Sequence, residues 1–235
     1  MSVAGDRGPS EEDPGVSEEQ RERWEKGGIY HVLLVSLLVL MALQPYAHVG
    51  EGVLVQLALA GLLLVGLAAV ASRRRVLIIG LLLGLPAVGL LFLPGRGPTV
   101  AGGVLAIAAL LFICFVILRR IARHPVVTAA TVSGSLVVYL TFGVVWAQAY
   151  WLAEHFRPGS FTGLSEAADV LVRQDLFYYS YVTLATLGYG DINPVGPEAR
   201  SLAIIEAIVG QLYLVVLVAG LVGLSLSQRQ RRPDQ

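Results

Sequence analysis

The chain has 235 residues, of which 55% are hydrophobic and 14% charged, and its formal net charge is zero. Soluble domains carry roughly one quarter charged residues, so this composition excludes a soluble globular protein. The single cysteine, Cys114, excludes a disulfide scaffold, the zero charge argues against a nucleic-acid binder, and the mean hydropathy of +0.70 excludes a disordered chain. A membrane protein with several spans remains.

Residues 1–28 form a polar, acidic segment before the first apolar stretch. They hold eight of the seventeen acidic residues, and we expect a mobile cytoplasmic tail. Ser17 and Gln20 have capping-box spacing, which predicts a helix that runs from Glu18 into the first span. Because the segment lacks the features of a cleavable signal, the first span is expected to act as an uncleaved anchor.

Six apolar segments follow, and a helix needs about 20 such residues to cross a bilayer. The predicted spans are 29–43, 53–71, 76–94, 100–118, 126–151 and 199–227. The first is short, but Tyr30 and Tyr46 lie where interfacial anchors are expected. No segment alternates polar and apolar residues, which argues against a membrane barrel. The sequence therefore predicts an all-α membrane protein with six transmembrane helices.

The basic residues indicate the orientation of these spans. With the N-terminus in the cytoplasm, thirteen of the seventeen Lys and Arg residues fall on the inside and four on the outside. Cytoplasmic loops carry such an excess. We therefore expect a multi-pass protein of the cell (inner or plasma) membrane, with both termini cytoplasmic.

Residues 29–123 are expected to form a four-helix region without gating charges. Voltage sensing requires three to four charges per subunit within the membrane, whereas Arg119, Arg120 and Arg123 all lie at the inner end of the fourth span. Gating by the usual charged helix is therefore rejected. In the third span, Gly80 and Gly84 have the spacing that favours close helix approach.

The long segment between the fifth and sixth spans, 152–198, is where the sequence becomes specific. Asp175 is a good N-cap, so residues 176–185 are predicted to form a helix of about 15 Å, too short to cross the bilayer. Thr186-Leu187-Gly188-Tyr189-Gly190 follows. Its alternate glycines admit backbone conformations that can turn successive carbonyl oxygens the same way. Such oxygens can replace the water shell of a cation, whose entry into hydrocarbon otherwise costs tens of kcal/mol.

This motif, between a short aromatic-rich helix and a long apolar helix, resembles the tetrameric potassium channels over about 75 residues. The resemblance implies a homotetramer in the lipid bilayer that conducts K⁺ passively, with a pore domain over 124–228 and a short cytoplasmic tail over 229–235. It implies a re-entrant pore helix and a selectivity filter whose oxygens coordinate K⁺. The filter residues would be Thr186, Leu187, Gly188, Tyr189 and Gly190.

Further roles follow from the same resemblance. Asp191 would lie at the outer mouth, and Thr183 matches a position that commonly braces the filter tyrosine. Tyr178 and Tyr179 stand where many relatives have tryptophan, and their hydroxyls could reach Asp191 or Tyr189. Val182 replaces a buried glutamate that is found in some relatives.

Two residues of the sixth span keep alternative interpretations. Gly210 lies where the family often has a gating hinge, although close helix packing would equally need a residue without a side chain. Glu206 is an acidic residue well inside a span, which makes it a functional candidate. It either faces the cavity, where it would raise local K⁺, or forms hydrogen bonds behind the pore helix.

Other functions fit less well. A less selective monovalent cation channel or an ion-transporter subunit is the alternative, but such transporters carry four pore loops per chain. An enzyme would need a nucleophile or a metal cluster, and the scattered histidines provide neither. No cofactor beyond permeating K⁺ and no nucleic-acid partner are expected. The gating stimulus stays open, with a separate regulatory subunit as one option.

Overall fold

The computed structural model describes residues 18–46, 53–70, 74–91, 93, 95–123, 128–165 and 169–230. Most of the predicted N-terminal tail, 1–28, and of the C-terminal tail, 229–235, lies outside these residues. The predicted helix from Glu18 into the first span is present as a single helix that ends at Leu43.

The described part of the chain is helical apart from one pair of two-residue strands. The elements are α1 (Glu18–Leu43), the 3₁₀ turn η1 (Gln44–Tyr46), α2 (Val53–Val70), α3 (Arg74–Leu91), α4 (Arg96–Arg123), α5 (Ala129–Phe156), β1 (Phe161–Thr162), α6 (Asp169–Leu184), β2 (Asn193–Pro194) and α7 (Pro197–Gln230). The strands pair antiparallel, with Phe161 opposite Pro194. The all-helical prediction is thereby confirmed.

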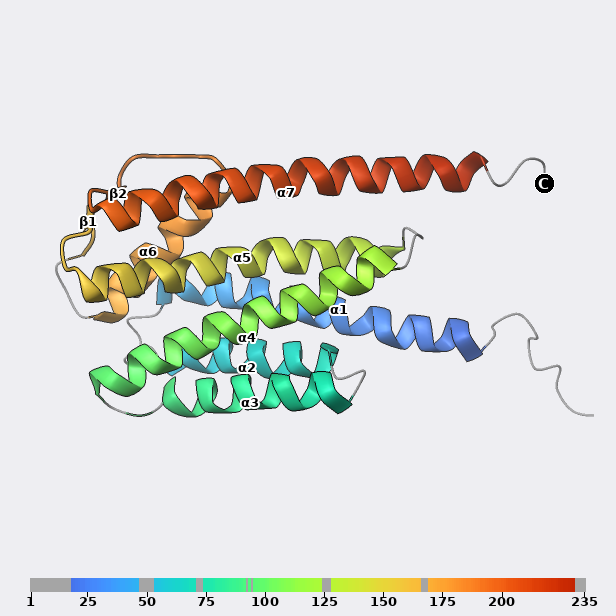
Figure 1. Cartoon of the computed structure of the whole chain (residues 1–235), viewed down its shortest axis with the longest axis horizontal. Helices are drawn as coiled ribbons and strands as arrows, with labels where there is room; N and C mark the ends of the chain where they lie inside the picture. The colour runs from blue at the N-terminus through green and yellow to red at the C-terminus, as the bar shows by residue number, and fades with distance from the viewer. Residues whose placement is uncertain are drawn as a thin grey trace, which may run out of the picture.

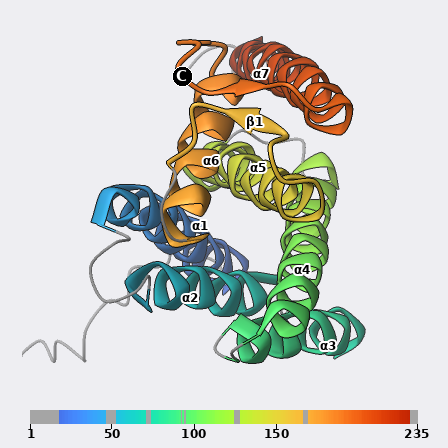
Figure 2. The ribbon, with the colours of Figure 1, turned by 90° about the vertical axis from the view of Figure 1, so that its left-hand side faces the viewer.

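Helix α5 is the centre of the bundle, and it contacts α1, α4, α6 and α7 (Figures 1 and 2). Its first turn is closed by a capping box, in which the Thr128 hydroxyl accepts from the Thr131 amide. The short helix α6 lies beside α5 at the end of the molecule that carries β1 and β2. The start of α1 and the end of α7 both lie at the opposite end of the molecule, on different sides of it (Figure 1).

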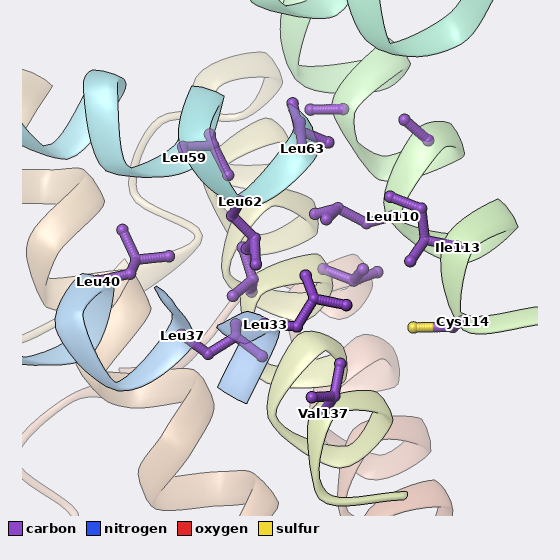
Figure 3. Packing of buried hydrophobic residues seen from close by; sticks show 14 of the residues in the cluster. Leu33, Leu37, Leu40, Leu59, Leu62, Leu63, Leu110, Ile113, Cys114 and Val137 are labelled. Carbon is purple, nitrogen blue, oxygen red and sulfur yellow. The ribbon is translucent and has the colours of Figure 1, made fainter. Parts of the chain in front are cut away.

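A continuous apolar core joins α1, α2, α4 and α5 (Figure 3). Leu37 and Leu63 are completely buried, and Phe177 of α6 belongs to the same cluster. Inside a bilayer, lipid is as apolar as leucine, so this cluster holds together by close van der Waals packing rather than by exclusion of water. Through Phe177, α6 thus shares a core with the N-terminal helices, which do not form a separate body.

Small residues permit this packing. A Cβ atom on Gly80 would lie 2.5 Å from Leu67 Cδ2, and one on Gly84 would lie 2.6 Å from Leu67 Cδ1. Real Cβ contacts essentially never come so close, so a side chain at either position would force Leu67 to move for α3 to rest on α2 as it does. The predicted close approach at this pair is confirmed.

Within the described ranges, three helices are long and apolar enough to cross a membrane. They comprise Gly97–Arg123 of α4, Ala130–Phe156 of α5 and Pro197–Gly220 of α7, while α1 and α2 contain shorter apolar stretches. Helices of this length support a multi-pass membrane protein, and six spans stay a prediction. One anchor prediction is corrected: Tyr30 is buried, and its hydroxyl accepts from Arg120 Nη1 of α4 at 3.1 Å.

Candidate functional site

Helix α6 begins earlier than the sequence predicted, at Asp169 rather than after Asp175. The Asp169 carboxylate in the first turn accepts from Trp151 Nε1 of α5 at 2.9 Å. Asp175 is not the N-cap; its carboxylate accepts instead from the backbone amide of Ser165 at 2.7 Å and restrains the preceding loop. The earlier start has a tertiary cause, because α5 supplies the partner of the first turn.

The start of α6 is further held by a guanidinium stacked on an indole. Arg173 lies 3.4 Å from the centroid of the Trp151 ring and donates to Asp169 at 2.8 Å. Burial lowers the pKa of Arg173, and the neighbouring Asp169 opposes that fall. Burial raises the pKa of Asp169, but hydrogen bonds from Trp151 and Arg173 outweigh it, so its pKa lies below the ordinary value. The contacts of Asp169 and Arg173 with Trp151 therefore hold the start of α6 against α5.

At the opposite end of α6 the chain turns back on the helix. The Leu187 amide donates to the Val182 carbonyl at 2.9 Å, and the Thr186 amide donates to the Thr183 carbonyl at 2.9 Å. These bonds satisfy carbonyls that a helix C-terminus otherwise leaves unpaired. The segment that follows is therefore attached directly to the last turn of α6.

Left-handed backbone recurs at alternate residues of this segment. The φ angles are +58° at Thr186, +59° at Gly188 and +78° at Gly190. Glycine adopts such angles freely, whereas they raise the conformational free energy of a residue with a Cβ. The alternation predicted for the two glycines is present, and Thr186 extends it by one position that the sequence did not indicate.

The same segment has almost no packing partners within its own chain. All residues from 185 to 191 are exposed, and the side chains of Leu187 and Tyr189 are 57% and 67% exposed. A leucine and a tyrosine exposed to this degree are apolar surface that contacts within the chain leave uncovered.

Beyond the glycines, side chains arrange the outer end. The Tyr178 hydroxyl donates to Asp191 Oδ2 at 2.8 Å, as the sequence allowed. This bond holds the pKa of the Asp191 carboxyl below its usual value. The Asn193 side-chain amide donates to the Gly190 carbonyl at 2.7 Å. The sequence did not predict this contact.

Tyr179 and Thr183 have other surroundings. Tyr179 points away from Asp191 and is buried edge-on against Tyr150 and Phe161, with ring centroids 5.1 and 5.3 Å away. Burial raises the pKa of Tyr179, and a hydrogen bond with Thr183 opposes that rise. Among the described hydrogen bonds, none joins Thr183 to Tyr189 within one chain, so a bracing role would have to act between chains.

A clamp formed by β1, β2 and their flanking residues secures the chain after the glycines. The Ser160 carbonyl accepts from the amides of Val195 and Gly196 at 2.8 and 2.9 Å. The Glu154 carboxylate at the end of α5 accepts from the amides of Gly159 and Phe161, which holds the loop that leads into β1.

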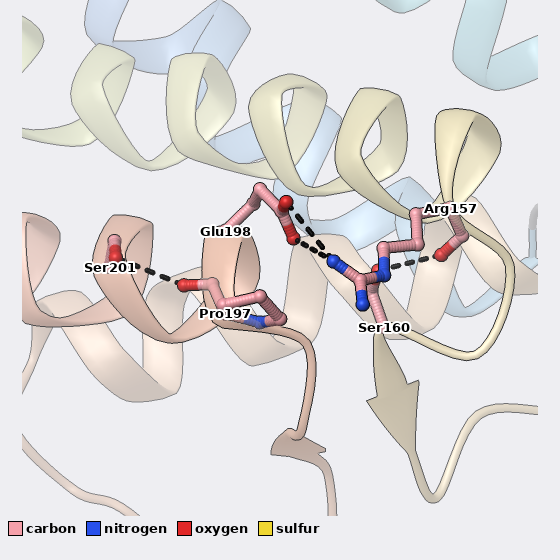
Figure 4. A network of polar contacts seen from close by, with 5 residues as sticks. All are labelled: Arg157, Ser160, Pro197, Glu198 and Ser201. Carbon is pink, nitrogen blue, oxygen red and sulfur yellow. Dashed lines mark hydrogen bonds and ion pairs between the residues drawn. The ribbon is translucent and has the colours of Figure 1, made fainter.

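Two further features complete this clamp. A Cβ on Gly163 (φ +84°) would lie 2.1 Å from the Asp191 carbonyl oxygen, so only glycine fits there. An exposed ion pair between Arg157 and Glu198, at 3.0 Å, links the end of α5 to the start of α7 (Figure 4). The outer segment is thus held from both neighbouring helices.

The structure shows the surroundings of Gly210 and Glu206, the two residues of α7 for which the sequence left alternative interpretations. A Cβ on Gly210 would lie 2.8 Å from Leu184 Cδ1 and 3.1 Å from the Leu184 carbonyl oxygen, a geometry that supports close packing of α7 on the end of α6. Glu206 is fully buried, and its carboxyl group forms hydrogen bonds with the hydroxyl groups of Ser180 of α6 and Tyr150 of α5. Its carboxylate therefore lies behind α6 in this chain.

Several contributing residues were missed by sequence reasoning. Tyr150 and Ser180 meet Glu206 across 56 and 26 residues of chain. Tyr139 of α5 donates to the Leu184 carbonyl at the end of α6 at 3.0 Å, and Glu154 holds the outer loop. Common hydroxyl and carboxylate residues of this kind give no local signal, although a carboxylate within a span did indicate that partners were needed.

Comparison with known proteins defines the class first. Residues 126–224, from the start of α5 to near the end of α7, match a family model described as "Ion channel". These residues contain α6, the glycine segment and the outer clamp. The similarity indicates a channel and not an enzyme.

Several relatives are named as potassium channels. The chain is 39% identical over 83 residues to the inward rectifier potassium channel Kirbac3.1 of Paramagnetospirillum magnetotacticum, which covers 34% of this chain and 24% of that protein. It is 34% identical over 95 residues to two pore potassium channel c of Oryza sativa subsp. japonica. This alignment covers 40% of this chain and 19% of that protein. Protein LctB of Bacillus caldotenax is 34% identical over 83 residues, which covers 34% and 61%.

The resemblance to the potassium channel family that the sequence indicated is thus confirmed, and it is confined to the C-terminal part of the chain. The chain spans about a fifth to a quarter of the length of the first two relatives. No solved structure matches.

Proposed function

We propose that this chain forms a potassium-selective channel in which four copies surround one pore and conduct K⁺ passively. The observation that carries the proposal is the alternation of left-handed backbone at Thr186, Gly188 and Gly190 on an exposed segment. Alternation of left-handed and right-handed backbone turns successive carbonyl oxygens toward one side of the segment. The oxygens of four such segments around an axis would together replace the hydration shell of an ion. K⁺ is the cargo of this protein and not a resident cofactor.

The surroundings of the segment support the same assignment. Helix α6 would be the re-entrant pore helix, and its negative C-terminal end would favour a cation near Leu184. Thr186 to Gly190 would be the filter, Asp191 its outer mouth, and Tyr178 and Asn193 would hold that mouth in place. Thr183 and Tyr179 would brace the filter from the pore helix. In the proposed organisation, 124–228 is the pore domain.

For the membrane arrangement, we infer six spans with both termini in the cytoplasm of a cell-membrane protein. The start of α1 and the end of α7 lie at the same end of the molecule (Figure 1), which supports an even number of membrane crossings. Residues 29–123 would form a peripheral four-helix region. Arg120 and Arg123 lie in the last turn of α4, and Arg120 bonds Tyr30, which supports anchoring rather than movement with voltage.

The test is ion flux into liposomes that contain the purified protein. We expect K⁺ uptake that barium blocks, with K⁺ strongly preferred over Na⁺. Gly188→Ala is expected to abolish conduction or selectivity, because alanine does not readily adopt φ +59°. Gly28→Ala is the matched control, since nothing lies within 4 Å of that position.

The outcomes separate the alternatives. Equal K⁺ and Na⁺ permeability would favour a less selective cation channel. An absence of barium-sensitive flux in every lipid and at every voltage would reject the channel assignment. Unchanged selectivity in Gly188→Ala would reject the filter assignment alone.

A further inference from the structure

Glu206 is a carboxyl group in the middle of the bundle that the conduction path described above does not use. Its side chain is completely buried within a single chain, and so are those of Ser180 and Tyr150 around it. It therefore has no opening toward a cavity through which it could attract ions. The carboxyl group instead joins three helices, with Tyr150 on α5, Ser180 on α6 and Glu206 itself on α7.

The hydrogen atoms in this cluster can be counted. Ser180 Oγ lies 2.6 Å from Glu206 Oε1 and 2.9 Å from the Gly143 carbonyl oxygen, and the Tyr150 hydroxyl bonds Oε2. The three contacts each need a proton, while two hydroxyl groups supply only two. A proton on Oε1 completes the set: Glu206 donates to Ser180, Ser180 donates to Gly143, and Tyr150 donates to Oε2.

The surroundings favour the same protonation state. Among the described ion pairs, none involves Glu206, so no Lys, Arg or His balances a charge there. An ionised carboxylate that is buried without a partner charge is strongly disfavoured, and such groups neutralise instead. A neutral acid with every oxygen in a hydrogen bond has no such penalty.

We propose that Glu206 is a neutral carboxylic acid that acts as a positioning residue for the filter by tying α7 to α6 and α5. The inference rests on the proposed channel function. Ser180 is two residues before Val182, whose carbonyl accepts the amides of Leu187 and Gly188. A shift of Ser180 therefore moves the turn from which the filter begins, so the position of α7 is transmitted to the conducting segment.

Two neutral substitutions of similar volume test the inference. Glu206→Gln keeps the junction, because its amide NH₂ donates to Ser180 and its carbonyl accepts from Tyr150. Glu206→Leu fills the space but leaves both buried hydroxyl groups without a partner. We expect K⁺ flux per folded tetramer within about twofold of wild type for Glu206→Gln, and a loss of about tenfold or more for Glu206→Leu. Glu25→Gln, the same chemical change in α1 and outside the residues that match the ion channel family, is the control that stays unchanged.

Two further measurements make the test independent of folding and of conduction. Infrared spectra of the wild type should contain a carboxylic-acid C=O band at neutral pH that Glu206→Gln removes and Glu25→Gln keeps. Ser180→Ala, a milder change that decides the question if Glu206→Leu does not fold, should lower the open probability or the K⁺ over Na⁺ ratio while the tetramer stays intact. A purely structural residue would alter the yield of tetramer and leave both of these unchanged.

Each result has one meaning. If Glu206→Gln lowers the K⁺ flux as much as Glu206→Leu, or if the infrared band is absent, the assignment of Glu206 as a neutral carboxylic acid is wrong. If Glu206→Leu and Ser180→Ala both conduct like the wild type, the positioning role is wrong. If the wild type conducts no K⁺, the proposed function fails, while the infrared band still decides the protonation of Glu206.

Discussion

The outer end of the glycine segment is organised by individual side chains. Tyr178 bonds Asp191 from α6, and Asn193 bonds the Gly190 carbonyl from the segment that follows. Both contacts restrain the last left-handed residue, for which glycine alone leaves many conformations open. Rigidity here is therefore supplied by neighbouring side chains and not by the glycines themselves.

A pH prediction follows for Tyr178→Phe. The Tyr178 hydroxyl stabilises the ionised carboxylate and holds the pKa of Asp191 below its ordinary value of about 3.9. The bond is thus intact above that value and is lost as the pH falls through the lowered pKa. Without the hydroxyl, the Asp191 pKa should rise toward the ordinary value, as measured by an NMR titration of the labelled carboxyl carbon. Tyr46→Phe, at an exposed site in η1, should leave the titration unchanged, and an equal midpoint in Tyr178→Phe would contradict the assignment.

At the scale of elements, α6 and α7 approach each other closely where α6 ends. Leu184, the last residue of α6, rests on Gly210, while Tyr139 of α5 donates to its carbonyl. Tyr213, one turn beyond Gly210, stacks on Tyr139 with ring centroids 5.9 Å apart. The end of α6 is therefore enclosed by α5 and α7, and these contacts oppose independent movement of the three helices.

Gly210→Ala tests whether this glycine serves packing or bending. The added methyl would meet Leu184 at 2.8 Å, and overpacking of this kind costs about 1–3 kcal/mol, against a gain of about 1 kcal/mol in helix propensity. We expect lower thermal stability in detergent. Gly61→Ala in α2, with nothing within 4 Å, should be neutral or stabilising. A Gly210→Ala protein as stable as Gly61→Ala but with altered open probability would instead support the hinge.

For the whole molecule, the least buried long helix is α7. Within one chain, 11% of the most apolar stretch of α7 is buried, compared with 56% of the corresponding stretch of α5. The residues exposed along it include Ile205, Leu212 and Val216. A helix that is exposed over most of its length, next to an exposed filter segment, is expected to find its partners in further copies of the chain.

The predicted assembly is a tetramer that K⁺ stabilises. Its protein mass should be four times the 25.1 kDa of one chain, as measured by native mass spectrometry. Because ions between the four filters bind only the native assembly, the thermal stability should be higher in K⁺ than in Na⁺, by about 2.7 kcal/mol at a concentration of one hundred Kd. Gly188→Ala should lose this difference. A monomeric protein, or equal stability in the two salts, would contradict the assembly.

Local chemistry explains which features could be predicted from the sequence. Apolar length indicated the helices, since a span must satisfy its backbone within itself. Alternate glycines indicated the unusual backbone of the segment, since the left-handed region is cheap only without a Cβ. The predicted start of α6, residue 176, was wrong by seven residues, because Trp151 of another helix holds Asp169 at the first turn.

The position of Glu206 depended on tertiary structure for a similar reason. From the sequence alone, a carboxyl group within a span could face water or be buried, and the two cases differ only in what surrounds it. Ser180 and Tyr150 come from two other helices, and the hydroxyl of each reaches the carboxyl only after α5, α6 and α7 have packed. Backbone conformation is encoded within a few residues, whereas the satisfaction of a buried polar group depends on distant parts of the chain.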